Sequence, residues 1–333
     1  MRILPFLLFF LLLNSCKEET PKQRKINGVS FVATRDAITQ RQALAVKQIN
    51  TNSVALMPFG FIKELDHPEI MFNSERQWFG ERKEGIAQNK KVFDSLGIEV
   101  MLKPQLWVSH GVFTGDIAMT TEENWQAFET SYKAFVLYFA EVASELNIPI
   151  FCLGTELNNF AVNRPDFFKK LIAEVRKVYA GKLTYAENWD VYQTIPFWKD
   201  LDFIGIDAYF PLSEEKTPSA STLKKSWKPF KEEMEQLSEQ VNKPILFTEY
   251  GYRSIDYVAK APWEHHRTDE QANLKAQQIA LTALYETFWD EPWFAGGFLW
   301  KWFPNENAGG EKDNRFTVQN KPALDVVKKY YTE

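Results

Sequence analysis

The chain has 333 residues, of which 45% are hydrophobic and 15% aromatic, so it can build one large domain or two of ordinary size. This composition provides a sizeable core and excludes global disorder. The formal net charge of −5, without a Lys/Arg cluster that could follow a phosphate backbone, argues against binding to nucleic acid.

The N-terminus has the pattern of a secretion signal. Arg2 supplies a positive start, and the apolar run 3–13 is too short to span a bilayer. Leu13-Asn14-Ser15-Cys16 follows and resembles a bacterial lipobox, whose cysteine is acylated. We therefore expect a signal peptide over 1–16 that ends in lipidated Cys16, a charged tether over 17–25 and a single domain over 26–333.

The residues after Cys16 and the second cysteine bear on the compartment. Lys17-Glu18-Glu19 resembles the signal that sends some bacterial lipoproteins to the cell surface. The expected location is the cell envelope, anchored to the outer membrane and exposed at the surface, although the leaflet that carries the anchor stays open. If Cys16 is acylated, Cys152 remains alone and no disulfide framework exists. Cys152 lies in an apolar run, which predicts a buried side chain without a catalytic role.

From residue 26 on, short apolar runs alternate with amphipathic stretches. Several runs are almost continuously apolar, as is typical of parallel strands buried on both faces. The predicted strands are 27–33, 53–59, 99–107, 149–157, 182–188, 203–210, 244–251 and 294–302. The predicted helices are 36–49, 81–96, 121–146, 163–178, 190–199, 218–241, 268–290 and 320–331. Two capping boxes, Thr120-x-x-Glu123 and Thr268-x-x-Gln271, support two of the helix starts.

Eight such alternations fit either a closed barrel or a doubly wound open sheet. An open sheet usually carries a Gly-rich phosphate turn after its first strand, but here Val32-Ala33-Thr34-Arg35 follows. No Gly/Ser- or Pro-rich linker divides the chain. The sequence therefore predicts the α/β class and a single (β/α)8 TIM barrel.

Active sites of such barrels lie at the carboxyl ends of the strands, where two glutamates stand out. The fourth strand ends in Gly154-Thr155-Glu156, and the seventh ends in Thr248-Glu249-Tyr250. Strict alternation would place Glu156 on the side of Ile150, Cys152 and Gly154, and Glu249 on the side of Ile245 and Phe247. Strands four and seven face each other across a barrel. Two opposed carboxyl groups are what glycoside hydrolysis needs, one to protonate the leaving oxygen and one to attack or to activate water.

Other polar strand ends compete for these roles. Glu187 ends the fifth strand and is a rival carboxylate, whereas Asp207 lies deeper and is expected to organise the interior. Tyr209, nearer the rim, is placed to hydrogen-bond a neighbouring carboxylate.

Aromatic and amide side chains also gather at the predicted rim. Flat rings stack on the apolar faces of sugars, and amides and imidazoles bind hydroxyl groups. The candidate sugar contacts are Trp107, His110, Asn158, Asn159, Asn188, Trp189, Tyr209, Trp300 and Trp302.

Sequence motifs of other enzyme classes are lacking. The four histidines, His67, His110, His265 and His266, include no i, i+4 ligand pair, and neither a Gly-x-Ser-x-Gly elbow nor a phosphate loop occurs. We expect no metal and no cofactor.

The strand ends and several further motifs, taken in this order, resemble glycoside hydrolase family 113, β-mannanases on a clan-A barrel, over nearly the whole mature length. The motifs are Gly154-Thr155-Glu156, Ile204-Gly205-Ile206-Asp207-Ala208-Tyr209, Thr248-Glu249-Tyr250-Gly251-Tyr252-Arg253-Ser254, Pro262-Trp263, Pro292-Trp293-Phe294-Ala295-Gly296-Gly297, Trp300-Lys301-Trp302 and Phe316-Thr317-Val318-Gln319-Asn320-Lys321-Pro322-Ala323.

The resemblance implies a function. It makes Glu156 the acid/base and Glu249 the nucleophile of a retaining hydrolysis of internal β-1,4-mannosidic bonds in mannan or manno-oligosaccharides. Retention requires carboxyl groups ~5 Å apart, whereas inversion needs ~6.5–9.5 Å. Most clan-A enzymes carry Asn where this chain has Thr155, and that Asn binds the sugar 2-hydroxyl, so the contact made here is open.

Mannan specificity follows from the resemblance alone. The same chemistry on another β-linked hexan, glucan or galactan, and a non-catalytic carbohydrate-binding lipoprotein remain alternatives. Endo or exo action also remains open, and a monomer is expected.

Overall fold

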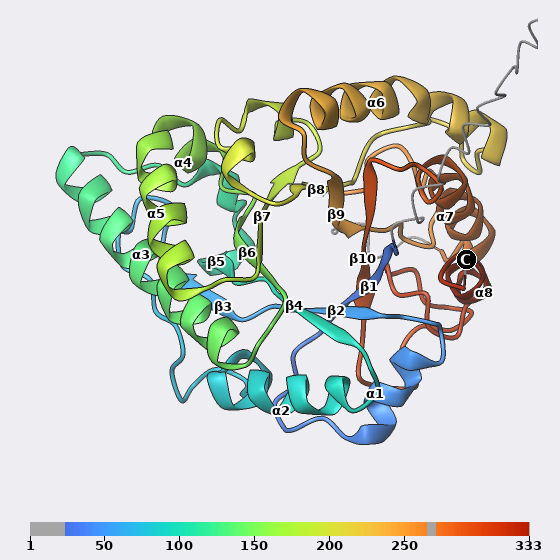
Figure 1. Ribbon diagram of the computed structural model, residues 1–333. Coiled ribbons are helices and arrows are strands. Elements are labelled where there is room, and N and C mark those ends of the chain that lie inside the picture. Colours follow the sequence, from blue (N-terminus) through green and yellow to red (C-terminus); the bar gives the residue numbers. More distant parts are fainter. Residues whose placement is uncertain (1–23, 265–270, 333) are drawn as a thin grey trace, which may run out of the picture.

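The computed structural model describes residues 24–264 and 271–332 and shows a closed barrel of parallel strands surrounded by helices (Figure 1). Around the barrel, each strand pairs with the next, and the last pairs with the first. The eight barrel strands are β1 (Ile26–Phe31), β2 (Ser53–Leu56), β4 (Glu99–Leu102), β6 (Ile150–Thr155), β7 (Lys182–Asn188), β8 (Ile204–Asp207), β9 (Ile245–Tyr250) and β10 (Phe294–Trp302). The predicted signal segment with Cys16, and 17–23 of the tether, lie outside the described residues.

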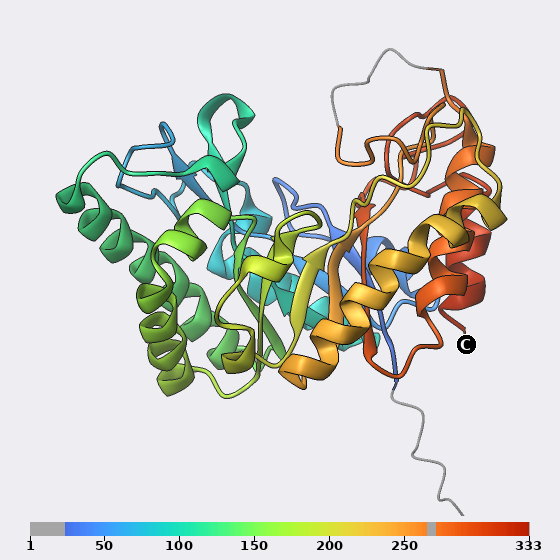
Figure 2. The ribbon, with the colours of Figure 1, turned by 90° about the horizontal axis from the view of Figure 1, so that it is seen from above.

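Helices cover the outside of the barrel, which confirms the predicted (β/α)8 architecture (Figures 1 and 2). They are α1 (Gln40–Lys47), α2 (Lys83–Asp94), α3 (Glu122–Glu145), α4 (Asn158–Asn163), α5 (Pro165–Val178), α6 (Ala220–Val241), α7 (Leu274–Phe288) and α8 (Ala323–Tyr330). Across the described ranges, none of the helices combines the length and the apolar character that a membrane span requires.

Three details of the helix prediction are wrong. The stretch 190–199 forms two short 3-10 turns, Tyr192–Thr194 and Trp198–Asp200, because Pro196 between them lacks the N–H that a continuous helix needs. The cap of α3 is Thr121 rather than Thr120, and its hydroxyl accepts from the N–H of Asn124 at 3.2 Å.

The third error concerns α7. This helix starts at Leu274, and the Asn273 side chain caps it by accepting from the N–H of Ala276 at 3.0 Å. The proposed Thr268 cap lies outside the described residues and before that start.

Prolines divide two of the predicted strands. The run 53–59 breaks at Pro58 into β2 and β3 (Phe59–Ile62), and the run 99–107 breaks at Pro104 into β4 and β5 (Gln105–Val108). Proline cannot donate to a ladder, so the barrel strands end there. Beyond the breaks, β3 and β5 pair with each other as a separate parallel sheet. This second sheet extends the two strands past the barrel mouth.

The interior of the barrel is packed at its amino end and polar at its carboxyl end. An apolar cluster fills the lower part, consisting of Ala55, Met101, Ile150, Phe203, Leu246, Ala295 and Phe298. Above Phe203, which directly precedes β8, comes Gly205, where a Cβ would lie 2.1 Å from the carbonyl oxygen of Tyr185. Glycine is therefore required, since it lets β7 and β8 approach closely beneath Asp207.

Hydrogen bonds from the last residues hold the barrel closed. The Tyr331 hydroxyl donates to the carbonyl of Gly28 in β1 at 2.6 Å and lies 2.6 Å from the hydroxyl of Tyr250 in β9. The Asn27 amide donates to the carbonyl of Tyr331 at 3.1 Å. Tyr331, which directly follows α8, thus links the first strand to the strand that carries Glu249.

Candidate active site

The turn after β6 presents Glu156 at the mouth of the barrel. Glu156 has a φ of 51°, a left-handed conformation that non-glycine residues adopt at a cost and that is often found at functional sites. Strand β7 holds the turn in place. The N–H of Glu156 donates to the carbonyl of Ala186 at 2.8 Å, and the N–H of Leu157 donates to the Tyr185 hydroxyl at 2.9 Å. The Tyr185 hydroxyl in turn donates to Glu187 at 3.2 Å.

Glu249, at the end of β9, is held by three donors. Its Oε1 accepts from Lys103 Nζ at 2.5 Å and from Gln105 Nε2 at 3.0 Å. Its Oε2 accepts from the Tyr209 hydroxyl at 3.0 Å, as expected for Tyr209. The side chains that surround Glu249 come from the ends of several strands, and Glu249 itself is only 7% exposed. These hydrogen bonds fix the position and the orientation of its carboxylate.

Strict alternation is wrong for Glu249. Phe247 packs outward on Phe288 of α7, with ring centroids 5.0 Å apart, whereas Thr248 points inward and donates to Asp207 Oδ1 at 2.7 Å. The register passes from Ile206↔Phe247 to Asp207↔Glu249, so β9 has one residue more than β8 at this point. This β-bulge lets both Thr248 and Glu249 face the interior.

A second irregularity affects Glu156. Ile150 lies in the interior cluster, but a Cβ on Gly154 would meet the Tyr132 hydroxyl of α3 at 2.3 Å. Gly154 therefore faces the helices and not the interior, contrary to the alternation. The register of β6 on β7 shifts between Cys152 and Thr155, which accounts for the change of side.

Lys103 and Gln105 belong to the site, and the sequence reasoning missed both. Lys103 is completely buried, and its Nζ lies 3.3 and 3.4 Å from the two carboxylate oxygens of Asp207 as well as beside Glu249. A signal was present, because Met101 faces the barrel interior and Lys103 is two residues further along. The continuous strand predicted over 99–107 concealed the break at Pro104 that brings Gln105 to the mouth as well.

The charges at the mouth set the protonation of the acidic groups. Burial, and then the negative charges of Asp207 and Glu249, raise the pKa of Glu156 well above its usual range. Burial and the charge of Glu249 also raise the pKa of Asp207. Burial alone would lower the pKa of Lys103, but the charges of Asp207 and Glu249 outweigh it and raise that pKa. Lys103 therefore stays cationic, and the protonated form of Glu156 is favoured.

The other acidic side chains at the carboxyl ends of the strands are buried within the protein. Asp207 is fully buried beneath Glu249, as expected for an interior organiser. Glu187 is fully buried, its Oε1 accepts from the N–H of Asn188 at 2.8 Å, and burial raises its pKa to about 7. Cys152 is buried as predicted, and burial raises the pKa of its thiol to about 12. None of the three is exposed to a substrate.

The four predicted rim tryptophans differ in accessibility. Trp107 on β5 is 47% exposed, and Trp189 is half-buried and stacks on Trp263, with ring centroids 5.2 Å apart. Trp300 is half-buried, and the Lys301 ammonium lies 4.9 Å from its ring centroid. Trp302 is only 5% exposed and packs in the hydrophobic core, so the structure does not offer it as a sugar platform.

The polar candidates at the rim also differ in their exposure and in their hydrogen bonds. His110 is exposed and has a φ of 65°, and Asn159 is half-buried. The Asn158 amide donates to Thr194 Oγ1 at 3.1 Å, and Asn188 Oδ1 accepts from the N–H of Trp189 at 2.9 Å. These two amides hold loops of the rim, in addition to any contact with a ligand. Among 24–264 and 271–332, no group of three or more His, Cys, Asp or Glu side chains could hold a metal.

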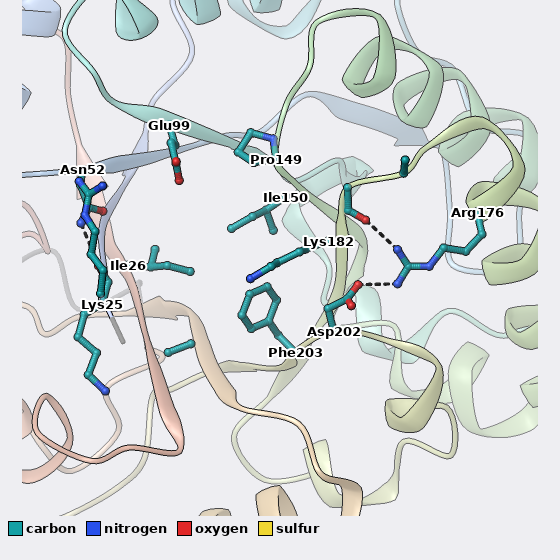
Figure 3. Close-up of a pocket in the computed structure, with 14 residues that line it drawn as sticks. Lys25, Ile26, Asn52, Glu99, Pro149, Ile150, Arg176, Lys182, Asp202 and Phe203 are labelled. Atoms are coloured by element: carbon teal, nitrogen blue, oxygen red, sulfur yellow. Dashed lines mark hydrogen bonds and ion pairs between the residues drawn. The ribbon is translucent and has the colours of Figure 1, made fainter. Parts of the chain in front are cut away.

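A cavity of about 550 Å³ lies at the opposite, amino end of the barrel (Figure 3). First residues of several strands line it, among them Ile26, Glu99 and Lys182. One charge pair lies on its wall, where Arg176 contacts Asp202 at 2.5 Å, and Asp202 also accepts from the N–H of Leu183 at 2.8 Å. In such barrels the amino end contributes stability, whereas the chemistry occurs at the other end.

Comparisons with known proteins agree with this placement. Residues 30–321 match the model of Glycoside Hydrolase Family 113. The structure is similar to the GH113 β-mannanase AaManA from Alicyclobacillus acidocaldarius, solved in complex with ManMIm, at a TM-score of 0.81 and 25% identity over 92% of this chain and 97% of that chain.

Two further solved structures extend the comparison. A GH113 β-1,4-mannanase complex gives a TM-score of 0.81 at 23% identity, over 93% of this chain and 100% of that chain. A β-glucuronidase of Faecalibacterium prausnitzii shares only the fold, at a TM-score of 0.62 and 14% identity over 93% of this chain and 49% of that chain. No curated protein matches the sequence.

Proposed function

The chain belongs to glycoside hydrolase family 113 and is a glycoside hydrolase that acts on carbohydrate; from this premise we propose that it cleaves β-1,4-mannosidic bonds with retention of configuration. In the proposed mechanism Glu249 is the nucleophile and Glu156 the acid/base. The distinct surroundings of the two carboxyl groups are the observation that supports this assignment.

The hydrogen bonds separate the two roles. Glu249 accepts from Lys103, Gln105 and Tyr209, which favours the anion that a nucleophile must be. In the described part of the chain no hydrogen bond reaches the carboxyl group of Glu156, and burial together with the surrounding negative charges favours its protonated form. A protonated carboxyl group beside an ionised one is the pair that double displacement requires.

The reaction then proceeds in two balanced steps. A carboxylate oxygen of Glu249 forms a bond to the anomeric carbon while the glycosidic C–O bond breaks, and the proton of Glu156 passes to the leaving oxygen. In the second step water attacks the anomeric carbon, Glu156 takes one proton from that water, and the ester to Glu249 is broken. Both groups return to their starting forms.

Release of reducing sugar from linear β-mannan, cellulose and β-galactan by the mature chain tests the proposed substrate. We expect release from mannan and little from the other two, since the two GH113 structures above are described as mannanases. Release from cellulose or galactan alone would replace mannan by another β-linked hexan. Binding of an oligosaccharide without any release would indicate a carbohydrate-binding protein.

We also propose that Cys16 carries a lipid that anchors the enzyme to the outer membrane. The support is the lipobox-like Leu13-Asn14-Ser15-Cys16 after a short apolar run. Bacterial cells that express the full chain should incorporate labelled fatty acid into it, and Cys16→Ser should abolish the label. Equal labelling of both proteins would contradict lipidation at Cys16.

A further inference from the structure

Two acidic groups share one buried ammonium at the barrel mouth, and a third interacts with them electrostatically. Glu249, Asp207 and Glu156 interact with one another electrostatically, and Lys103 lies between the first two. Lys103 is 0% exposed, so it cannot touch a bound glycan in this arrangement. Its function must act through the groups that it contacts.

We propose that Lys103 is a positioning residue whose single charge, divided between Glu249 and Asp207, sets the pH range in which the nucleophile is ionised. The proposal rests on the proposed function and extends it to a residue that does not contact the substrate. Asp207 is the counterweight, since its ionised form competes with Glu249 for the ammonium, which lies 3.3 and 3.4 Å from the two Asp207 oxygens. Thr248 Oγ1 fixes Asp207 at 2.7 Å, so the competition has a defined geometry.

Other groups that face Glu249 bear on its ionisation but cannot replace Lys103. Gln105 and Tyr209 donate neutral hydrogen bonds to Glu249, and Glu156 adds negative charge only above its raised pKa. Lys301 on β10 is the other cation that acts on this region, but no ion pair between it and Glu249 forms in the described chain, and burial lowers the pKa of Lys301. The ammonium in direct contact with Glu249 is that of Lys103.

The test is the dependence of kcat/KM on pH for Lys103→Met, Asp207→Asn and the double variant, with the mannan substrate. Without Lys103, two adjacent carboxylates repel each other, and the acid limb should move up by about one pH unit or more. On that limb a shift of one unit is about a tenfold loss at fixed pH. Without the Asp207 charge, the ammonium interacts with Glu249 alone, and the acid limb of the kcat/KM profile should move to lower pH. The double variant should lie between the two.

The matched control is Lys321→Met. Lys321 also has a fully buried side chain and pairs with a carboxylate, Asp313 at 2.8 Å, away from Glu249. We expect this variant to lose stability but to keep the acid limb of the wild type. If Lys103→Met folds and its acid limb does not move, Lys103 is a structural residue and the proposal is overturned. If Lys103→Met does not fold, an unmoved acid limb in Asp207→Asn has the same meaning.

A second measurement separates this proposal from the proposed function. The chain is labelled with ¹³C at its carboxyl groups, the signal of Glu249 is assigned by its absence in Glu249→Gln, and its titration is followed by NMR. The expected shifts have the same signs as the kinetic ones. Suppose that the wild type cleaves no mannan while the titration of Glu249 still moves up in Lys103→Met and down in Asp207→Asn. That result would refute the proposed substrate and leave the role of Lys103 in place. Identical titrations in all variants would refute the role of Lys103 even in an active enzyme.

Discussion

Glu249→Gln should lower kcat/KM on mannan on the order of 10⁴-fold or more, the scale of loss when a covalent nucleophile is removed. The amide keeps the size of the carboxylate and one oxygen that can still accept from Lys103 or Tyr209, so the site should remain packed. What disappears is the charge that attacks the anomeric carbon. The measurement is reducing-sugar release against pH, together with thermal unfolding to show that the variant is folded.

A covalent label identifies the nucleophile directly. An activated 2-deoxy-2-fluoro mannoside should form a stable ester with the wild type, and peptide mass spectrometry should place it on Glu249. Glu187→Gln is the control, because Glu187 also ends a barrel strand but is fully buried. We expect it to keep most of the activity and to accept the label. A label on any residue other than Glu249 would show that the roles are assigned wrongly.

Glu156→Gln should lose about 10²–10⁴-fold on mannan, the usual contribution of general acid–base catalysis. The loss should be much smaller for the first step on aryl mannosides with good leaving groups, since these leave without a proton. In the wild type the raised pKa of Glu156 keeps it protonated to higher pH, and activity falls as pH rises through that pKa. In the variant this alkaline limb should be absent.

Chemical rescue completes the case for Glu156. In Glu156→Ala, azide can attack the glycosyl-enzyme without a base, so it should restore turnover of an aryl mannoside and give a β-mannosyl azide. Equal losses on mannan and on activated aryl mannosides, with no effect of azide, would mean that Glu156 serves structure rather than proton transfer.

The sequence predicted most of the elements and pointed to the two candidate carboxylates because both depend on local pattern. Apolar runs and their polar ends identify the strands and point to Glu156 and Glu249 regardless of detailed register. The side that each residue faces does not follow from the pattern. The bulge between β8 and β9 reverses the alternation at Glu249, and it depends on how two strands pair across the barrel.

The missed residues have a similar cause. A lysine such as Lys103 is normally expected to be exposed to solvent. Lys103 is an interior group because it follows β4 on the side that faces the barrel interior and contacts Asp207 there. The aromatic character of Trp302 likewise pointed to the rim, although it packs in the core. In both cases the environment is created by residues far away in the chain, which a single sequence without structure does not reveal.

The closure of the barrel by β1 and β10, which Tyr331 reinforces, has a consequence for biosynthesis. Strand β1 pairs with β10, and Gly28 receives the hydroxyl of Tyr331, so contacts of the greatest sequence separation complete the ring. When a ribosome has made both carboxylates, β10 and α8 are still missing. The nascent chain therefore contains both candidate carboxylates before its barrel can close, and closure waits until β10 and Tyr331 have been translated, as slow non-local pairing requires.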